Sequence, residues 1–144
     1  MLFRSALYLL DTMVLPALRQ RQRNPHLVAW LQSVPQSNLF LSVIALGEVE
    51  RGIVAVAPRD PDFAQRLVIR LDDVLRRLAP RILTVDIATA RRWGRLAAVQ
   101  RHSGADLLIA ATALKHGLTV ATSNTRHFLG TGVVLVDPLA APQS

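Results

Sequence analysis

The sequence predicts an α/β fold in three layers, with a parallel sheet of about five strands flanked by helices. Three observations predict it. Short apolar blocks with the length of buried strands recur along the 144 residues. Longer amphipathic blocks separate them, and a helix between two strands is the usual crossover of a parallel sheet. No internal repeat, low-complexity segment or linker interrupts the alternation, so we expect a single domain over residues 1–144.

The apolar blocks place the strands in order. We expect strands at residues 7–10, 39–43, 82–85, 118–122 and 133–136. The first block, LYLL, has the apolar character of a strand buried on both faces. The last ends at Asp137-Pro138, where the acid is expected to belong to a turn.

The blocks between the strands predict the helices. We expect these at residues 25–34, 44–56, 61–79, 88–102 and 106–116. The helix that begins at Pro61 is the most regular, because its apolar residues recur three and four positions apart, and Pro80 ends it. Asp86 is expected to cap the helix at 88–102, and Gly117 suits the end of the last helix.

The composition excludes several classes of protein. Hydrophobic residues make up 51% of the chain, which is too many for a disordered protein. No apolar run reaches the roughly 18 residues of a transmembrane helix, and the N-terminus resembles a first strand more than a signal peptide. The chain has no cysteine, so it has neither disulfides nor thiolate metal ligands. We therefore expect a cytoplasmic protein without a membrane partner.

The charge favours a polyanionic partner. Lys and Arg number 17 against 10 Asp and Glu, a net charge of +7, and Lys115 is the single lysine. Arginine suits bidentate contacts with phosphate. Arg91, Arg92 and Arg95 on one predicted helix, or the basic segment 19–23, are candidates for RNA contact. The alternative is that these arginines are ordinary solvated surface residues.

Four polar residues stand where a functional site would form. Asp11 follows the first strand, Asp106 opens the last helix, Glu48 lies within the helix after the second strand, and Asn124 follows the fourth strand. Each has a structural alternative. Asp11 and Asp106 could be N-caps, Glu48 could pair with Arg51, and Asn124 could be a turn residue.

Together the four residues indicate a metal site. In a doubly wound sheet, sites form outside the carboxyl ends of the strands, where the four could meet. Three neighbouring carboxylates cannot all stay ionised unless a cation neutralises them. Hard oxygen ligands without a His or Cys pattern favour Mg²⁺ or Mn²⁺. A basic surface around such a site suggests hydrolysis of a phosphodiester by metal-activated water.

At these residues the sequence resembles the PIN-domain ribonucleases, specifically the VapC/FitB type of toxin from bacterial type II toxin–antitoxin modules. The matching stretches run in order along nearly the whole chain: YLLDTMVL, LFLSVIALGEVERGI, ADLLIAATALKHGLTVATSNTRHF and VVLVDP. The resemblance implies a PIN-like fold, Mg²⁺- or Mn²⁺-dependent endoribonuclease activity and a homodimer. It also implies a cognate antitoxin that inhibits the enzyme.

The resemblance also implies roles for single residues. Asp11, Glu48 and Asp106 would hold the metal, and Asn124 would complete the catalytic set. The supporting polar groups near the same site would be Thr12, Ser42 and Thr122.

Three features depart from the family pattern. Met13 stands where the family usually has Asn, and a thioether cannot replace the hydrogen bonds of an amide. The connector RHSGAD before Asp106 is several residues shorter than usual. Ser123 stands where the family often has Arg or Lys before the Asn, and His127 stands where it often has Asp before the Phe. These departures motivate an alternative, a catalytically weakened PIN-like protein that binds RNA or an antitoxin without cleaving. The motifs leave a DNA-directed nuclease open as well.

Overall fold

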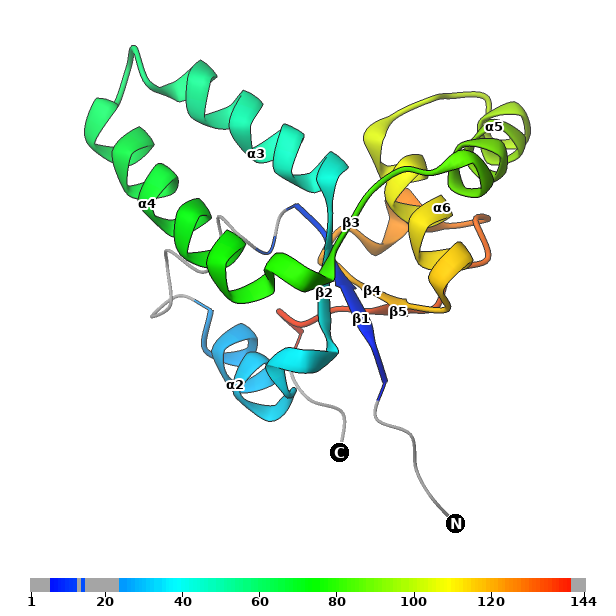
Figure 1. Cartoon of the computed structure of the whole chain (residues 1–144), viewed down its shortest axis with the longest axis horizontal. Coiled ribbons are helices and arrows are strands. Elements are labelled where there is room, and N and C mark those ends of the chain that lie inside the picture. Colours follow the sequence, from blue (N-terminus) through cyan, green and yellow to red (C-terminus); the bar gives the residue numbers. More distant parts are fainter. Residues whose placement is uncertain (1–5, 13, 15–23, 141–144) are drawn as a thin grey trace.

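A computed structural model describes residues 6–12, 14 and 24–140 (Figure 1). Its centre is a five-stranded sheet in the order β3-β2-β1-β4-β5, and every neighbouring pair is parallel. The strands are β1 Tyr8–Leu10, β2 Leu39–Ser42, β3 Ile82–Leu83, β4 Thr119–Ala121 and β5 Leu135–Val136. The predicted α/β fold is confirmed.

Helices connect the strands as predicted. They are α2 Pro25–Ser33, α3 Val43–Val56, α4 Pro61–Leu78, α5 Ile87–Gln100 and α6 Ala105–His116. Short 3₁₀ turns lie at Gln36–Asn38 (η2), Ala79–Arg81 (η3) and Thr125–Phe128 (η4). Figure 1 shows α3 and α4 as an antiparallel pair on one side of the sheet centre, with α5 and α6 on the other side. Within the described ranges, no helix is both long and apolar enough to cross a bilayer.

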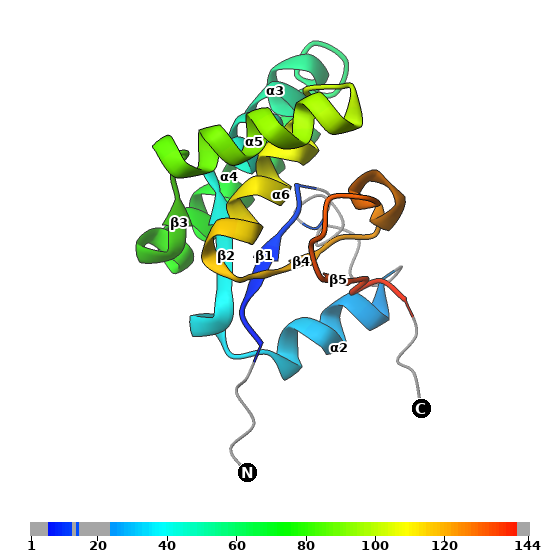
Figure 2. The same cartoon turned by 90° about the vertical axis from the view of Figure 1, so that its right-hand side faces the viewer.

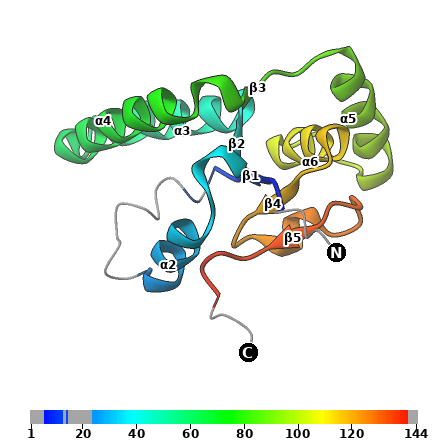
Figure 3. The same cartoon turned by 60° about the horizontal axis from the view of Figure 1, so that its bottom comes forward.

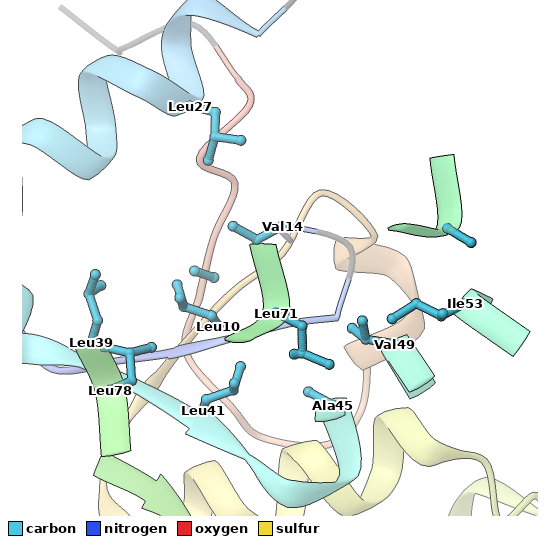
Figure 4. Packing of buried hydrophobic residues seen from close by; sticks show 12 residues of the cluster. Leu10, Val14, Leu27, Leu39, Leu41, Ala45, Val49, Ile53, Leu71 and Leu78 are labelled. Carbon is cyan, nitrogen blue, oxygen red and sulfur yellow. The ribbon is translucent and has the colours of Figure 1, made fainter. Parts of the chain in front are cut away.

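The alternating directions of strand side chains create two apolar cores. Leu9 and Val120 pack with Ile109 and Phe128 on the α6 side of the sheet. Leu10 and its neighbours on β2 face the opposite way, toward α2, α3 and α4. Figure 4 shows the side chains of this second core, and Figure 2 shows the sheet between α6 and α2. The sheet is therefore covered on both faces, which explains its continuous apolar strands.

Local signals set most helix ends. Ser42, Asp60 and Asp86 each accept a backbone N–H at the start of α3, α4 and α5, so the predicted cap at Asp86 is confirmed. Gly117 ends α6 in the left-handed conformation, with φ of 67°.

One helix end differs from the prediction by more than one residue. Helix α5 stops at Gln100, two residues before the predicted end, because Arg101 adopts a left-handed conformation with φ of 63°. Only residues 101–104 then separate α5 from α6.

The topology creates a switch point beside the central strand. From β1 the chain proceeds to β2 and β3 on one side, and it later returns to form β4 and β5 on the other (Figure 3). Crossover connections therefore leave β1 and β4 in opposite directions, and crevices for ligands open at such points outside the carboxyl ends of the strands. Asp11 follows β1 and Thr122 follows β4 at this place.

Candidate metal centre and nuclease cleft

A polar cleft of about 700 Å³ opens at the switch point. It collects side chains from the end of β1, from α3, from the end of α5 and the connection to α6, from α6 itself, and from η4 and its flanks. The polar and charged residues that line it are Asp11, Thr12, Glu48, Arg51, Gln100, His102, Asp106, Asn124, Arg126 and His127. All four residues predicted from the sequence, Asp11, Glu48, Asp106 and Asn124, thus line one cleft.

Asp11 is the most deeply placed acid of the cleft. Asp11 is 7% exposed. Its backbone N–H donates to the carbonyl of Ala121 at 3.0 Å and so extends the pairing of β1 with β4. Its Oδ1 accepts the backbone N–H of Thr12 at 2.8 Å. Its Oδ2 accepts the hydroxyl of Thr122 at 2.7 Å. The sheet edge therefore fixes the orientation of this carboxylate.

The surroundings of Asp11 disfavour its ionised form. Burial raises the pKa of Asp11 most strongly, and the nearby charge of Asp106 raises it further. The hydrogen bonds from Thr122 and Thr12, together with the charge of His127, oppose the rise. The net result is a pKa above the ordinary value. A buried carboxylate beside a second carboxylate is stabilised when a cation neutralises both.

Asp106 lies in the first turn of α6, and the N-cap alternative for it is not what the structure shows. The N-cap is Gly104, and no side chain makes a capping hydrogen bond there. Asp106 is therefore free to face the cleft, where the positive end of the helix dipole favours its charge. A Cβ at position 104 would lie 2.7 Å from Oδ1 of Asp106. A glycine at this position thus leaves room for the carboxylate.

Glu48 lines the cleft from α3 but has another partner. Its Oε2 is 3.1 Å from Nη2 of Arg51, the pairing that the sequence left open as an alternative. Among the residues that the structure describes, no three His, Cys, Asp or Glu side chains are close enough to hold a metal ion. Glu48 must leave Arg51 if it is to join Asp11 and Asp106 around a cation.

Asn124 lines the cleft on the β4 side, and Thr122 is fully buried beside it. The hydroxyl of Thr122, which donates to Asp11, also accepts the backbone N–H of Asn124 at 3.0 Å. Asn124 precedes η4, and its carbonyl accepts the N–H of His127 at 3.0 Å. Asn124 is thus both a turn residue and a cleft residue. One buried hydroxyl links it to the main carboxylate.

Of the other two supporting residues, one lines the cleft and one does not. Thr12 lines the cleft, as predicted. Ser42 is fully buried at the end of β2, and its hydroxyl accepts the N–H of Ile44 to cap α3. The pairing of Leu10 with Leu41 puts Ser42 next to Asp11 in the sheet. The structure therefore shows Ser42 as a helix cap beside the site, and it does not line the cleft.

The basic residues of the cleft are not those predicted to contact RNA. Arg91, Arg92 and Arg95 lie on α5 and do not line it, whereas Arg51 and Arg126 do. The only sequence feature that could have indicated Arg51 and Arg126 is that they stand close to Glu48 and Asn124 in the chain. The contact of the α5 arginines with RNA stays a prediction.

Two further predictions cannot be placed. Met13 and the basic segment 19–23 lie outside the described residues. The short connector RHSGAD is described, and it supplies His102, Ala105 and Asp106 to the cleft.

The donor set suits a hard divalent cation. Asp11, Glu48, Asp106 and Asn124 offer carboxylate and amide oxygens, the ligand type that Mg²⁺ and Mn²⁺ accept. Burial raises the pKa of Asp11 despite its two hydrogen bonds and the nearby His127, so a cation beside this carboxylate would favour its ionised form. These residues therefore fit such an ion, provided that Glu48 changes partner.

A second, apolar groove of about 230 Å³ adjoins the cleft. It lies between α3 and α4, and its lining includes Val49, Val56, Phe63, Leu67 and Val74. Thr12 and Glu48 line both the groove and the cleft. An occupant of the groove would consequently touch the acidic site.

Comparisons with known proteins agree with this architecture. The PIN domain family matches residues 8–131. The VapC ribonuclease Y4jK of Sinorhizobium fredii is 34% identical over 90% of this chain and 95% of its own. The crystal structure of FitAcB from Neisseria gonorrhoeae contains a chain that is 33% identical, with a TM-score of 0.80 over 92% of this chain and 98% of that one. A toxin-antitoxin complex from Klebsiella pneumoniae contains a chain that is 27% identical, with a TM-score of 0.64 over 93% and 98%.

Proposed function

The chain belongs to the PIN-domain family, and from this premise we propose that it is a divalent-metal-dependent endoribonuclease, the toxin of a toxin–antitoxin module. The observation that carries the proposal is the cleft. Three acids and an amide from four separate parts of the chain line it, and the most buried acid has a raised pKa. A relative named as a VapC ribonuclease supports RNA as the substrate.

The residues of the cleft have distinct proposed roles. Asp11, Glu48 and Asp106 would hold Mg²⁺ or Mn²⁺, which when bound supplies activation of water for attack on a phosphodiester. Thr122 orients Asp11, and it positions Asn124 through the same hydroxyl. Arg126 and His127 present donors to the same space and suit an anionic phosphate.

We also propose a cognate antitoxin as the partner. The similar chain in the Klebsiella pneumoniae structure comes from a toxin-antitoxin complex. The apolar groove between α3 and α4 is a surface where a partner could bury apolar side chains next to Glu48. A homodimer is the expected assembly, and light scattering of the purified protein would test it.

Substitution of the two carboxylates at the sheet edge and the α6 start tests the proposed activity. Asp11→Asn and Asp106→Asn should each abolish growth arrest and divalent-dependent cleavage of a structured RNA, because each removes a charged ligand. Asp137→Asn is the matched control, since that acid accepts the N–H of Leu139 in a turn and does not line the cleft. Cleavage that persists in both cleft variants would contradict the metal-site proposal.

One observation favours the alternative of a binding protein that does not cleave. Glu48 pairs with Arg51, and the described residues form no ready group of three metal-binding side chains. If the unmodified protein binds RNA or the antitoxin but cleaves no more RNA than Asp11→Asn does, this alternative is correct.

A further inference from the structure

Arg51 contacts one of the acids of the proposed metal site. It lies one helical turn after Glu48 on α3, and its Nη2 is 3.1 Å from Oε2 of that residue. The Arg51 side chain is 79% exposed and that of Glu48 31%, so the pair stands at the mouth of the cleft. Exposed ion pairs of this kind are weak and readily exchange partners.

The Glu48 carboxylate has two competing uses. Its oxygens can accept a hydrogen bond from the guanidinium of Arg51, or they can bind a cation together with Asp11 and Asp106. A guanidinium that stays at Glu48 repels an incoming divalent ion and occupies one of its ligands. The absence of a ready three-residue metal group in the described residues agrees with Glu48 being held by Arg51.

We propose that Arg51 exchanges partners when the site is loaded. In the metal-free protein it neutralises Glu48. When Glu48 turns to a divalent cation, the guanidinium is released at the mouth of the cleft and contacts a phosphate of the RNA. Arg51 is then a positioning residue that couples cation binding to RNA binding. This inference rests on the proposed metal-dependent ribonuclease function.

The chemistry of arginine supports the second contact. Its planar guanidinium binds phosphate through two parallel hydrogen bonds, and it stays charged when it leaves a carboxylate. Among the described residues, two arginines line the cleft: Arg51, and Arg126, which approaches from η4. The two cations therefore flank the acids from different elements, as a phosphate backbone crossing the cleft would need.

Helix α4 offers a matched control. Arg77 is 3.1 Å from Asp73 in a similar exposed pair along one helix, and neither residue lines the cleft or the groove. Arg77→Gln removes the same charge and the same kind of contact as Arg51→Gln. Any difference between the two variants comes from the position of Arg51.

The first measurement is calorimetric titration with Mn²⁺, without RNA. Arg51→Gln should bind Mn²⁺ about two- to fivefold more tightly than the unmodified protein, as expected from loss of an exposed competing pair. Arg77→Gln should bind as the unmodified protein does. Equal affinities for all three, in a protein that cleaves RNA, would overturn the exchange while leaving the proposed function intact.

The second measurement is a double-mutant cycle of RNA affinity in EDTA, where no cleavage occurs. Arg51→Gln alone should change the affinity little, because Glu48 holds the guanidinium. In a Glu48→Gln background the same change should weaken binding several-fold and reduce the salt slope by about 0.7, the value for one single-strand phosphate contact. Additive effects would overturn the exchange.

A separate result distinguishes failure of the underlying function. If Asp11→Asn and Asp106→Asn both bind Mn²⁺ as the unmodified protein does, no metal site involves these acids, and both the function and the exchange are wrong.

Discussion

At the scale of single residues, Asp11 shows why a carboxylate stands at the end of a core strand. The N-cap explanation accounts for one oxygen at most, whereas the structure gives both oxygens a donor, from Thr12 and Thr122. Two hydrogen bonds orient the carboxylate but do not offset its burial, because its pKa is still raised. The folded protein therefore holds Asp11 in a state in which burial disfavours the ionised form, and a bound cation would stabilise that form.

This state predicts a dependence of stability on pH. The pKa of Asp11 in the folded protein lies above its ordinary value of 3.8. Folding therefore favours the protonated carboxyl, so its contribution to stability is full below pH 3.8 and is lost as the pH rises through the raised pKa. Without divalent ions, Asp11→Asn should unfold at a higher temperature than the unmodified protein at neutral pH. The difference should shrink as the pH falls toward 4.

Thermal unfolding in EDTA across this pH range measures the effect. Asp137→Asn, a partly buried turn acid outside the cleft, controls for the loss of one charge. Adding Mn²⁺ should raise the unfolding temperature of the unmodified protein and leave that of Asp11→Asn unchanged. Parallel pH curves for the unmodified protein and Asp11→Asn would contradict the assignment.

Gly104 predicts a separation of activity from stability. Its φ of −64° is accessible to alanine, but a Cβ would lie 2.7 Å from Oδ1 of Asp106. The carboxylate can rotate away, so Gly104→Ala should change the free energy of unfolding by less than about 1 kcal/mol. The displaced ligand should lower RNA cleavage at least tenfold, by analogy with misplaced groups in other active sites.

Denaturant unfolding and cleavage kinetics of the same Gly104→Ala preparation check this prediction. Gly94→Ala is the control, because a Cβ there meets nothing within 4 Å and the residue lies outside the cleft. Full activity in Gly104→Ala would show that Asp106 does not need its present position.

At the scale of elements, α3 belongs to both candidate surfaces. Its capped N-terminus follows β2 beside Asp11, its residues Glu48 and Arg51 face the cleft, and Val49, Gly52 and Val56 line the apolar groove. A partner that lies along α3 in the groove would reach the acid that the cleft uses. Inhibition and catalysis would then share Glu48.

The glycines of the helices predict an effect on stability. A Cβ at Gly52 in α3 or at Gly94 in α5 meets nothing within 4 Å. Alanine favours the helical state over glycine, so Gly52→Ala and Gly94→Ala should each stabilise the protein by about 0.5–1 kcal/mol. Gly117→Ala should destabilise it, because φ there is +67°. Denaturant unfolding of the three variants compares them directly, and a destabilised Gly52→Ala would show that the groove is tighter than described.

At the scale of the whole molecule, the arginines that contribute to the net charge of +7 lie partly at the cleft and partly away from it. Arg51 and Arg126 line the cleft, whereas Arg91, Arg92 and Arg95 are spread along α5. A polyanion that enters the cleft therefore has a defined pair of arginines beside the acids. The α5 arginines could serve only the parts of the RNA outside the cleft.

This arrangement predicts how RNA binding depends on salt. If both Arg91 and Arg95 contact phosphates, Arg91→Glu with Arg95→Glu should weaken binding to single-stranded RNA and reduce the salt slope by about 1.4. Arg59→Glu, at an exposed position after α3, should be nearly silent. Affinities measured in EDTA at several salt concentrations give the slopes. An unchanged slope in the α5 variant would show that these arginines are ordinary solvated residues.

Sequence alone was sufficient for the fold class, for the order of strands and helices, and for four of the residues that line the cleft. The reason is that these features depend on local signals. Apolar blocks with strand length, helical periodicity after Pro61, and the caps at Asp86 and Gly117 act over a few residues. Asp11, Asp106 and Asn124 follow strands or open a helix, and strand ends meet at one sheet edge in any doubly wound fold.

Tertiary structure decided what those side chains contact. The end of α5 at Gln100 depends on Arg101 turning left-handed, which no local pattern indicated. The link from Asp11 through Thr122 to Asn124 joins residues 111 positions apart at its first step. The choice of Glu48 between Arg51 and the other acids is a balance of charges in three dimensions, and spacing along a helix leaves it open. Contacts between distant segments set such balances, because Coulomb energy depends on distance in space and on burial.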